Sequence, residues 1–106
     1  MKQENDTPRV AYFGSWSSYG VPRVPQEPLS REEAEGRTTY YVGHFDRDDR
    51  LVRFTKFFQG ALEWQDEYEY WDNGKVRVRR LSRAGGPASV QRFDRKGRIL
   101  PEEASS

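Results

Sequence analysis

The chain contains no cysteine, and this absence excludes both a disulfide framework and a thiolate metal site. No run of apolar residues reaches the length that crosses a bilayer, and the opening stretch MKQENDTPR lacks the apolar core of a secretion signal. We therefore expect a cytoplasmic protein with no membrane association. Neither sign of charge dominates, because 18 Lys and Arg stand against 17 Asp and Glu. The formal net charge of +1 provides no global field for nucleic acid or acidic lipid.

Residues for catalysis or metal binding are equally scarce. His44 is the single histidine, and only Asp46 stands close to it, so we predict no metal site. No serine has a histidine at motif spacing, and no nucleophile elbow or phosphate loop is present. The sequence therefore predicts no catalytic residue and no cofactor, and it favours a protein that is not an enzyme.

What the chain does have is aromatic residues and a repeated turn motif. The 106 residues suit one domain, and six Tyr, six Phe and three Trp supply bulk for a thin core. Three segments align without gaps, each running from an aromatic residue through turn-forming residues and a base to an aliphatic residue: FDRDDRL (45–51), YWDNGKV (70–76) and FDRKGRI (93–99). Gly60 and Gly85 add a second turn signal between the copies. Two turn signals in each period predict a string of β-hairpins.

The register of these hairpins follows from the three-residue turn Asp72–Gly74, with Gly74 in the left-handed conformation. This turn sets Tyr70 opposite Val76, and continued pairing would set Tyr68 opposite Val78 and Glu69 opposite Arg77. One face then collects rings and aliphatic groups while the other pairs acids with bases. The predicted buried face comprises Tyr41, Phe45, Leu51, Phe57, Leu62, Trp64, Tyr68, Tyr70, Val76, Val78, Phe93 and Ile99.

We therefore expect a mainly β fold, an antiparallel meander of about six or seven strands with one short helix. The strands are predicted near 10–16, 39–46, 50–58, 61–71, 75–83, 87–94 and 98–100. Prolines at 22, 25 and 28 predict a loop between the first two. Ser30 and Glu33 form a capping box for a helix that Gly36 ends. Residues 9–100 are expected to form one domain between a disordered lead (1–8) and a disordered tail (101–106).

The repeat resembles the YD repeat of Rhs-type proteins, which form ribbons of antiparallel hairpins. Asp49 replaces the motif glycine in the first copy, and Trp71 replaces the motif aspartate in the second. The whole span 11–100 is also similar to a family of small bacterial proteins of unknown function, through Tyr19–Glu33 (YGVPRVPQEPLSREE) and RTTYYVGHFD (37–46). Both resemblances imply the hairpin fold, and neither implies an activity.

A first candidate site is the cluster Arg53, Asp66 and Arg80, which the predicted registers place side by side on an otherwise apolar face. Charges there must be paired or solvated. A structural ion triplet is the preferred interpretation, and the alternative is a small-anion or ligand site, or an enzyme site, with two guanidinium forks.

A second candidate is the basic C-terminal part, because residues 75–98 hold nine Lys and Arg but only one acid, Asp94. A nucleic-acid-binding protein would use such a stripe, here Arg77, Arg79, Arg83, Arg92 and Arg95. Pairing with the acids of residues 61–71 and protection of a sheet edge are the preferred explanation.

The leading prediction is a non-catalytic protein-binding or accessory module that binds a protein partner or a second copy. It would act through the second face of the sheet (Val52, Phe54, Phe58, Leu81 and Val90) or through the aromatic loop with Trp16 and Tyr19.

Overall fold

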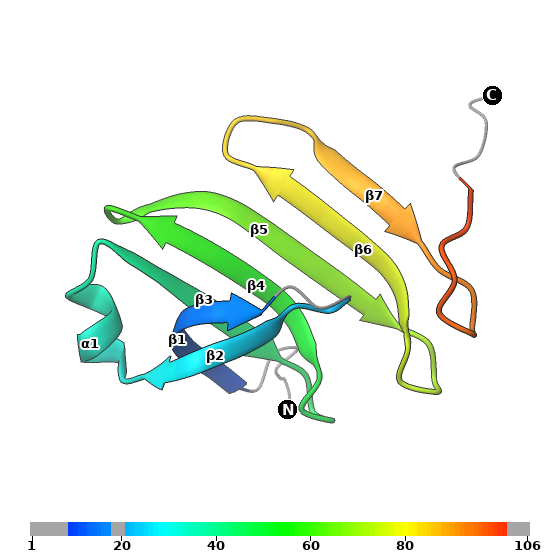
Figure 1. Ribbon diagram of the computed structural model, residues 1–106, viewed down its shortest axis with the longest axis horizontal. Coiled ribbons are helices and arrows are strands. Elements are labelled where there is room, and N and C mark those ends of the chain that lie inside the picture. The colour runs from blue at the N-terminus through cyan, green and yellow to red at the C-terminus, as the bar shows by residue number, and fades with distance from the viewer. Residues whose placement is uncertain (1–8, 18–20, 102–106) are drawn as a thin grey trace, which may run out of the picture.

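The computed structural model describes residues 9–17 and 21–101, which form a seven-stranded antiparallel sheet and one short helix (Figure 1). The predicted mainly β fold is confirmed. In chain order the elements are β1 (Arg9–Ser17), β2 (Val24–Leu29), α1 (Arg31–Glu35), β3 (Thr39–Phe45), β4 (Leu51–Phe58), β5 (Ala61–Tyr70), β6 (Val76–Arg83) and β7 (Ala88–Arg92). The order across the sheet is β2-β1-β3-β4-β5-β6-β7, so the meander runs from β3 to β7. The predicted lead (1–8) and all but the first residue of the predicted tail lie outside the described residues.

The repeated turns form as the sequence predicts. The backbone N–H of Trp71 donates to the carbonyl of Lys75 at 2.8 Å, and Gly74 takes a φ of 89°. Asp49 and Gly97 occupy the same place in the other two copies, with φ of 64° and 92°. Aspartate is among the non-glycine residues that tolerate this region, which explains how the first copy forms its turn without glycine. The expected last strand over 98–100 is reduced to a single bridge between Phe93 and Ile99.

The proline-rich segment contains a strand that the sequence analysis missed. Pro25 and Pro28 both lie within β2, which pairs only with β1 among the described strands. Prolines are excluded from a central strand because they have no N–H to donate to a neighbouring strand, but an edge strand tolerates them where that position faces solvent. The prolines were therefore a correct signal for an edge and a wrong signal for a loop.

Helix α1 begins and ends where the sequence predicts. The Ser30 hydroxyl accepts from the Glu33 N–H at 3.0 Å, and the Glu33 carboxylate accepts from the Ser30 N–H at 2.8 Å. This reciprocal pair lowers the pKa of Glu33, chiefly through the bond from the Ser30 backbone. The helix buries Ala34 completely and packs against β1, β2 and β3.

Three β-bulges displace the register from the predicted one. The predicted pairs Phe45–Leu51, Phe57–Leu62 and Tyr70–Val76 are all present, but the register shifts beside each of them. The extra residues are Val52 in β4, Glu63 in β5 and Arg77 in β6. An inserted residue reverses the alternation of side chains beyond it. Tyr68 therefore lies opposite Arg79, and the predicted pairing of Tyr68 with Val78 is wrong.

The reversed alternation changes which side chains form the core. We call inner face the side of the sheet that carries the buried cluster Phe13, Phe45, Leu51, Phe54, Trp64, Tyr68, Val76 and Phe93, and outer face the opposite side. Phe54 is fully buried, and the Tyr41 ring stacks on it at 5.4 Å between centroids and 2° between planes. Phe57 and Leu62, predicted to be buried on this side, lie on the outer face. The bulge at Val52 explains the error for Phe57 and the bulge at Glu63 explains it for Leu62, because the prediction assumed uninterrupted alternation along β4 and β5.

The sheet curls so that one end covers the inner face. In Figure 1, β1 and β2 cross in front of β3 and β4. Trp16 on β1 meets Trp64 on β5 edge to face at 6.1 Å, although the two strands are not neighbours in the sheet. Gly43 leaves room for two core rings against β3, since a Cβ there would lie 3.1 Å from the rings of Phe13 and Phe45. The strands β1 and β2 thus cover the part of the inner face that carries Trp64.

Candidate binding surfaces

The predicted grouping of Arg53, Asp66 and Arg80 is wrong. Arg53 lies opposite Glu67, and Glu67 lies opposite Arg80, so these three side chains belong to the outer face. Asp66 lies opposite Phe54 on the inner face. The bulge at Glu63 displaces the pairing of β4 with β5, and the bulge at Arg77 displaces that of β5 with β6, so neither Arg53 nor Arg80 lies opposite Asp66.

Asp66 instead forms a buried network with two other arginines. Its carboxylate is completely buried and accepts from Arg23 Nε at 2.7 Å and from Arg79 Nε at 2.9 Å. The hydroxyl of Tyr68 donates to the same carboxylate at 2.8 Å. Burial raises the pKa of Tyr68, and the hydrogen bond to Asp66 raises the pKa of Arg79. Each oxygen of a buried charge thus has a donor, which is the condition under which such a charge is tolerated.

Arg23 is the member of this network that the sequence analysis missed. Its guanidinium lies between two indole rings, 4.1 Å from the centroid of Trp16 and 4.3 Å from that of Trp64. Its backbone N–H donates to the Tyr68 hydroxyl at 3.1 Å. A desolvated cation on tryptophan faces contributes about 2 kcal/mol. Arg23 therefore fastens the segment before β2 onto the inner face, and the network is structural.

The outer face carries an apolar surface that we call the outer strip, composed of Val10, Tyr12, Tyr40, Val42, Phe57 and Leu62. Tyr40 stacks on Phe57 at 5.2 Å and 17°, and Tyr12 lies 6.5 Å from Tyr40. These residues line a hollow of about 380 Å³. Val10 and Leu62 are 45% and 40% exposed, which is high for aliphatic side chains grouped with aromatic rings.

Two nitrogen atoms in residues that line this hollow lack hydrogen bonds. Within the described residues, His44 Nδ1 and Arg53 Nε are buried and have no hydrogen-bond partner. The Glu67 carboxylate is 3.5 Å from Arg53 Nε, which is an ion pair without the alignment of a hydrogen bond. Burial, and secondarily the charge of Arg53, lowers the pKa of His44. His44 and Arg53 both line the hollow, although these two nitrogen atoms are themselves buried beneath its surface.

Alternating charges border the outer strip on the side of β6. Arg80 lies 2.7 Å from Glu69, and Arg77 lies 3.4 Å from the other oxygen of the same carboxylate. These contacts lower the pKa of Glu69, with the Arg80 hydrogen bond as the largest cause. An apolar centre with a charged, solvated border is the usual arrangement of a protein interface.

The residues predicted to bind a partner are divided between the two faces. Phe54 is buried at the centre of the core, and Leu81 packs against the same cluster, so both are wrong as exposed residues. Val52 is the half-buried bulge residue of β4, whereas Phe58 and Val90 are about 40% exposed. Trp16 packs on the core rather than forming an exposed loop, and Tyr19 lies outside the described residues.

The five arginines predicted for nucleic acid do not share one surface. Arg79 bonds to Asp66 on the inner face, while Arg92 lies opposite Val78 on the outer face. Arg77 and Arg95 pair with Glu69 and Asp72, at 3.4 Å and 2.6 Å. Arg83, opposite Trp64, is exposed at the end of β6. The excess of positive charge is therefore divided by the sheet rather than gathered into a stripe.

Other kinds of site find little support in the described part of the chain. Residues 9–17 and 21–101 contain no group of three or more His, Asp or Glu that could hold a metal ion. In the same ranges no helix is long and apolar enough to cross a membrane.

Fold and surfaces together define a small antiparallel sheet domain with its core on the inner face and an apolar strip on the outer one. The chain belongs to a family of unknown function, DUF6156, whose model matches residues 5–102. This match agrees with the resemblance to an uncharacterised family and brings no activity with it. Searches of curated proteins and of solved structures gave no match.

Proposed function

We propose that the protein is a non-catalytic binding module that docks a protein partner through the outer strip. The observation that supports this most is the stack of Tyr12, Tyr40 and Phe57 beside the exposed side chains of Val10 and Leu62. Rings of this kind contribute much of the energy at interfaces because they bury large area at small entropic cost. We place the module in the bacterial cytoplasm, a location that the lack of cysteine and the family resemblance support.

The chemistry of the strip also describes the partner. Apolar side chains of the partner would cover the exposed side chains of Leu62 and Val10. Its border would present charges that alternate in sign, to match Arg80, Glu69 and Arg77. Self-association is the competing outcome, because copies of a module with a net charge of +1 would repel one another little.

The experiment replaces Leu62 in the full chain by a photo-crosslinking residue and identifies the adducts formed in cells. The matched control places the same residue at Val24, which is 46% exposed but does not line the hollow. We expect one defined adduct from position 62 only, and we expect Leu62→Glu to prevent its capture while Val24→Glu does not. Circular dichroism checks that both variants fold.

The possible results separate the proposals. A heterologous protein crosslinked at 62 and lost with Leu62→Glu supports docking of a partner. A homodimer adduct, with light scattering that shows a dimer, replaces the partner by a second copy. Equal adducts at 62 and 24, or capture unaffected by Leu62→Glu, would refute the outer strip as the binding surface.

A further inference from the structure

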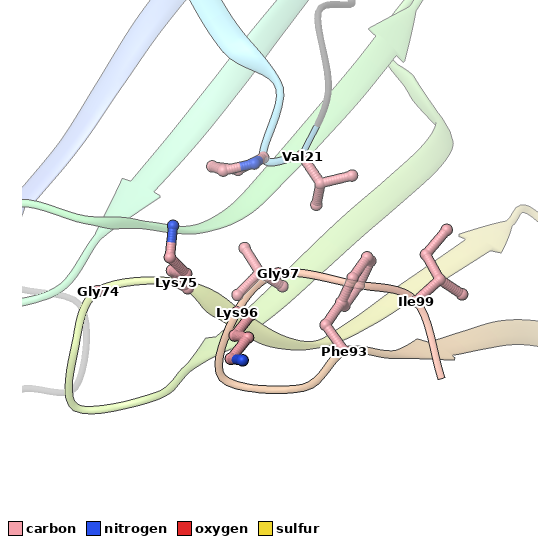
Figure 2. Close-up of a pocket in the computed structure, with 9 residues that line it drawn as sticks. Val21, Gly74, Lys75, Phe93, Lys96, Gly97 and Ile99 are labelled. Atoms are coloured by element: carbon pink, nitrogen blue, oxygen red, sulfur yellow. The ribbon is translucent and has the colours of Figure 1, made fainter. Parts of the chain in front are cut away.

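A separate hollow lies on the inner side of the sheet, beneath the segment Val21–Pro22 and beside two of the repeated turns (Figure 2). Its volume is about 550 Å³, which falls in the range of roughly 300–1,000 Å³ that small-molecule sites occupy. The lining residues are Val21, Pro22, Gly74, Lys75, Val76, Phe93, Lys96, Gly97 and Ile99. None of them belongs to the outer strip.

The floor of this hollow is apolar, and its open side exposes an aliphatic group. Val76 and Phe93 are 6% and 5% exposed and belong to the core, so they form a fixed surface. Ile99 is 61% exposed, the highest value among the large apolar side chains of the described residues. A ligand with an apolar body would cover Ile99. Binding would then remove the side chain of Ile99 and the apolar surface of the ligand from water, which is favourable.

The described residues give the hollow a positive charge. Among the described residues that line it, Lys75 and Lys96 are the only ionisable ones. The acids of the neighbouring turns are engaged elsewhere, since Asp72 pairs with Arg95 at 2.6 Å and Asp94 with Arg98 at 3.4 Å. Within residues 9–17 and 21–101, neither lysine forms an ion pair. Their ammonium groups can therefore receive an anion at the rim of an apolar cavity.

The fold holds one of these lysines in place. Gly97 has a φ of 92°, and a Cβ built on it would lie 3.8 Å from Cδ of Lys75, so the lysine stem runs alongside that turn. In Figure 2 the Lys75 side chain extends from its own turn toward the segment that carries Val21. The amine is thus directed to the same space that the apolar residues enclose.

We infer that this hollow binds a small amphipathic carboxylate, that is, an aliphatic chain or ring with one carboxylate. Lysine acts as a point charge rather than a planar fork, which suits a single anionic group. The apolar floor offers no further side-chain hydrogen bonds, so the rest of the ligand must be apolar. The site is independent of the outer strip and of the function proposed for it.

The test is a two-dimensional ¹H–¹⁵N NMR titration of the full chain with octanoate and, in parallel, with 1-octanol. We expect both to shift the amides of Val76, Phe93 and Ile99, and octanoate to bind more tightly. Replacing one lysine, by Lys75→Gln or Lys96→Gln, should weaken octanoate by about two- to fivefold and leave octanol unchanged, as befits a partly exposed ion pair. Arg92→Gln is the matched control, because it removes an exposed positive charge outside the hollow.

Each other result overturns the inference. Equal affinity for octanoate and octanol, or a preference for octanoate that survives the double lysine replacement, would remove the role of the charge. Shifts confined to Tyr40 and Phe57 would move the ligand to the outer strip. Binding to anionic phospholipid vesicles without any binding of monomeric octanoate would assign the lysines to a lipid surface instead.

Discussion

Replacing Asp66 by asparagine should destabilise the domain more than any exposed charge change of similar size. The substitution keeps the shape of the side chain and removes its charge, which leaves the guanidiniums of Arg23 and Arg79 without a counter-ion. Removing one partner of a buried ion pair costs about 3–5 kcal/mol. We expect the lower half of that range, because the arginine side chains are 13% and 22% exposed and can recover some hydration.

The magnitude matters because small domains have little stability to lose. A total of roughly 5–15 kcal/mol is typical, so Asp66→Asn removes a large share of it. Glu69→Gln is the matched control, since Glu69 also pairs with two arginines but is 43% exposed. Exposed pairs contribute about 0.2–1 kcal/mol each, so the control should lose less than about 2 kcal/mol.

Urea unfolding followed by tryptophan fluorescence measures the stability of both variants. Trp16 and Trp64 lie against Arg23, so their fluorescence reports on the network directly. With a slope of about 1–3 kcal/mol per molar urea, the Asp66→Asn midpoint should fall by about 1 M or more. If Asp66→Asn costs no more than Glu69→Gln, the account of the network as a buried structural pair is refuted. A further comparison sets Asp66→Asn against the triple replacement of Asp66, Arg23 and Arg79 by apolar residues. The triple variant leaves no charge unpaired, so it should be more stable than Asp66→Asn.

Further expectations concern single positions. Gly74→Ala should lower the free energy of unfolding by about 1–2 kcal/mol through its positive φ alone, because nothing lies within 4 Å of the new Cβ. Gly86→Ala should be nearly neutral, and the urea midpoints of the two variants test this difference. Burial and Arg53 depress the pKa of His44, so the unfolded chain binds its proton more readily and stability should fall as pH drops below about 6.5. Unfolding at pH 5 and 7.5 should show this loss in the natural chain and not in His44→Asn, and an equal loss in both would contradict it. Ser30→Ala should remove about 1 kcal/mol by deleting the cap of α1, and Arg31→Ala, which changes only an exposed pair, serves as its control.

Much of the fold could be predicted because its signals are local. Turn residues, the capping box and the aromatic and aliphatic pairs beside each turn all depend on neighbours in the sequence, and they gave the correct strands from β3 to β7. The bulges could not be predicted in the same way. Val52, Glu63 and Arg77 are ordinary strand residues, and no glycine or proline marks them.

The predicted grouping of Arg53, Asp66 and Arg80 failed for the same physical reason. Asp66 was correctly recognised as a charge on an apolar face, but its partners depend on which register the whole sheet adopts. One of them, Arg23, comes from 43 residues away and from a segment whose prolines had suggested a loop. The general lesson from these residues is that a buried acid predicts the presence of bases nearby, while only tertiary packing determines which bases they are.

The joint burial of Asp66, Arg23 and Arg79 also constrains how this domain diverges over evolutionary time. A single neutral replacement at any one of these three positions leaves a charge unpaired. Evolutionary intermediates that change one position at a time therefore pass through weakened proteins. Relatives should consequently keep all three or exchange them as a set, and the indoles at 16 and 64 should vary along with the base at 23.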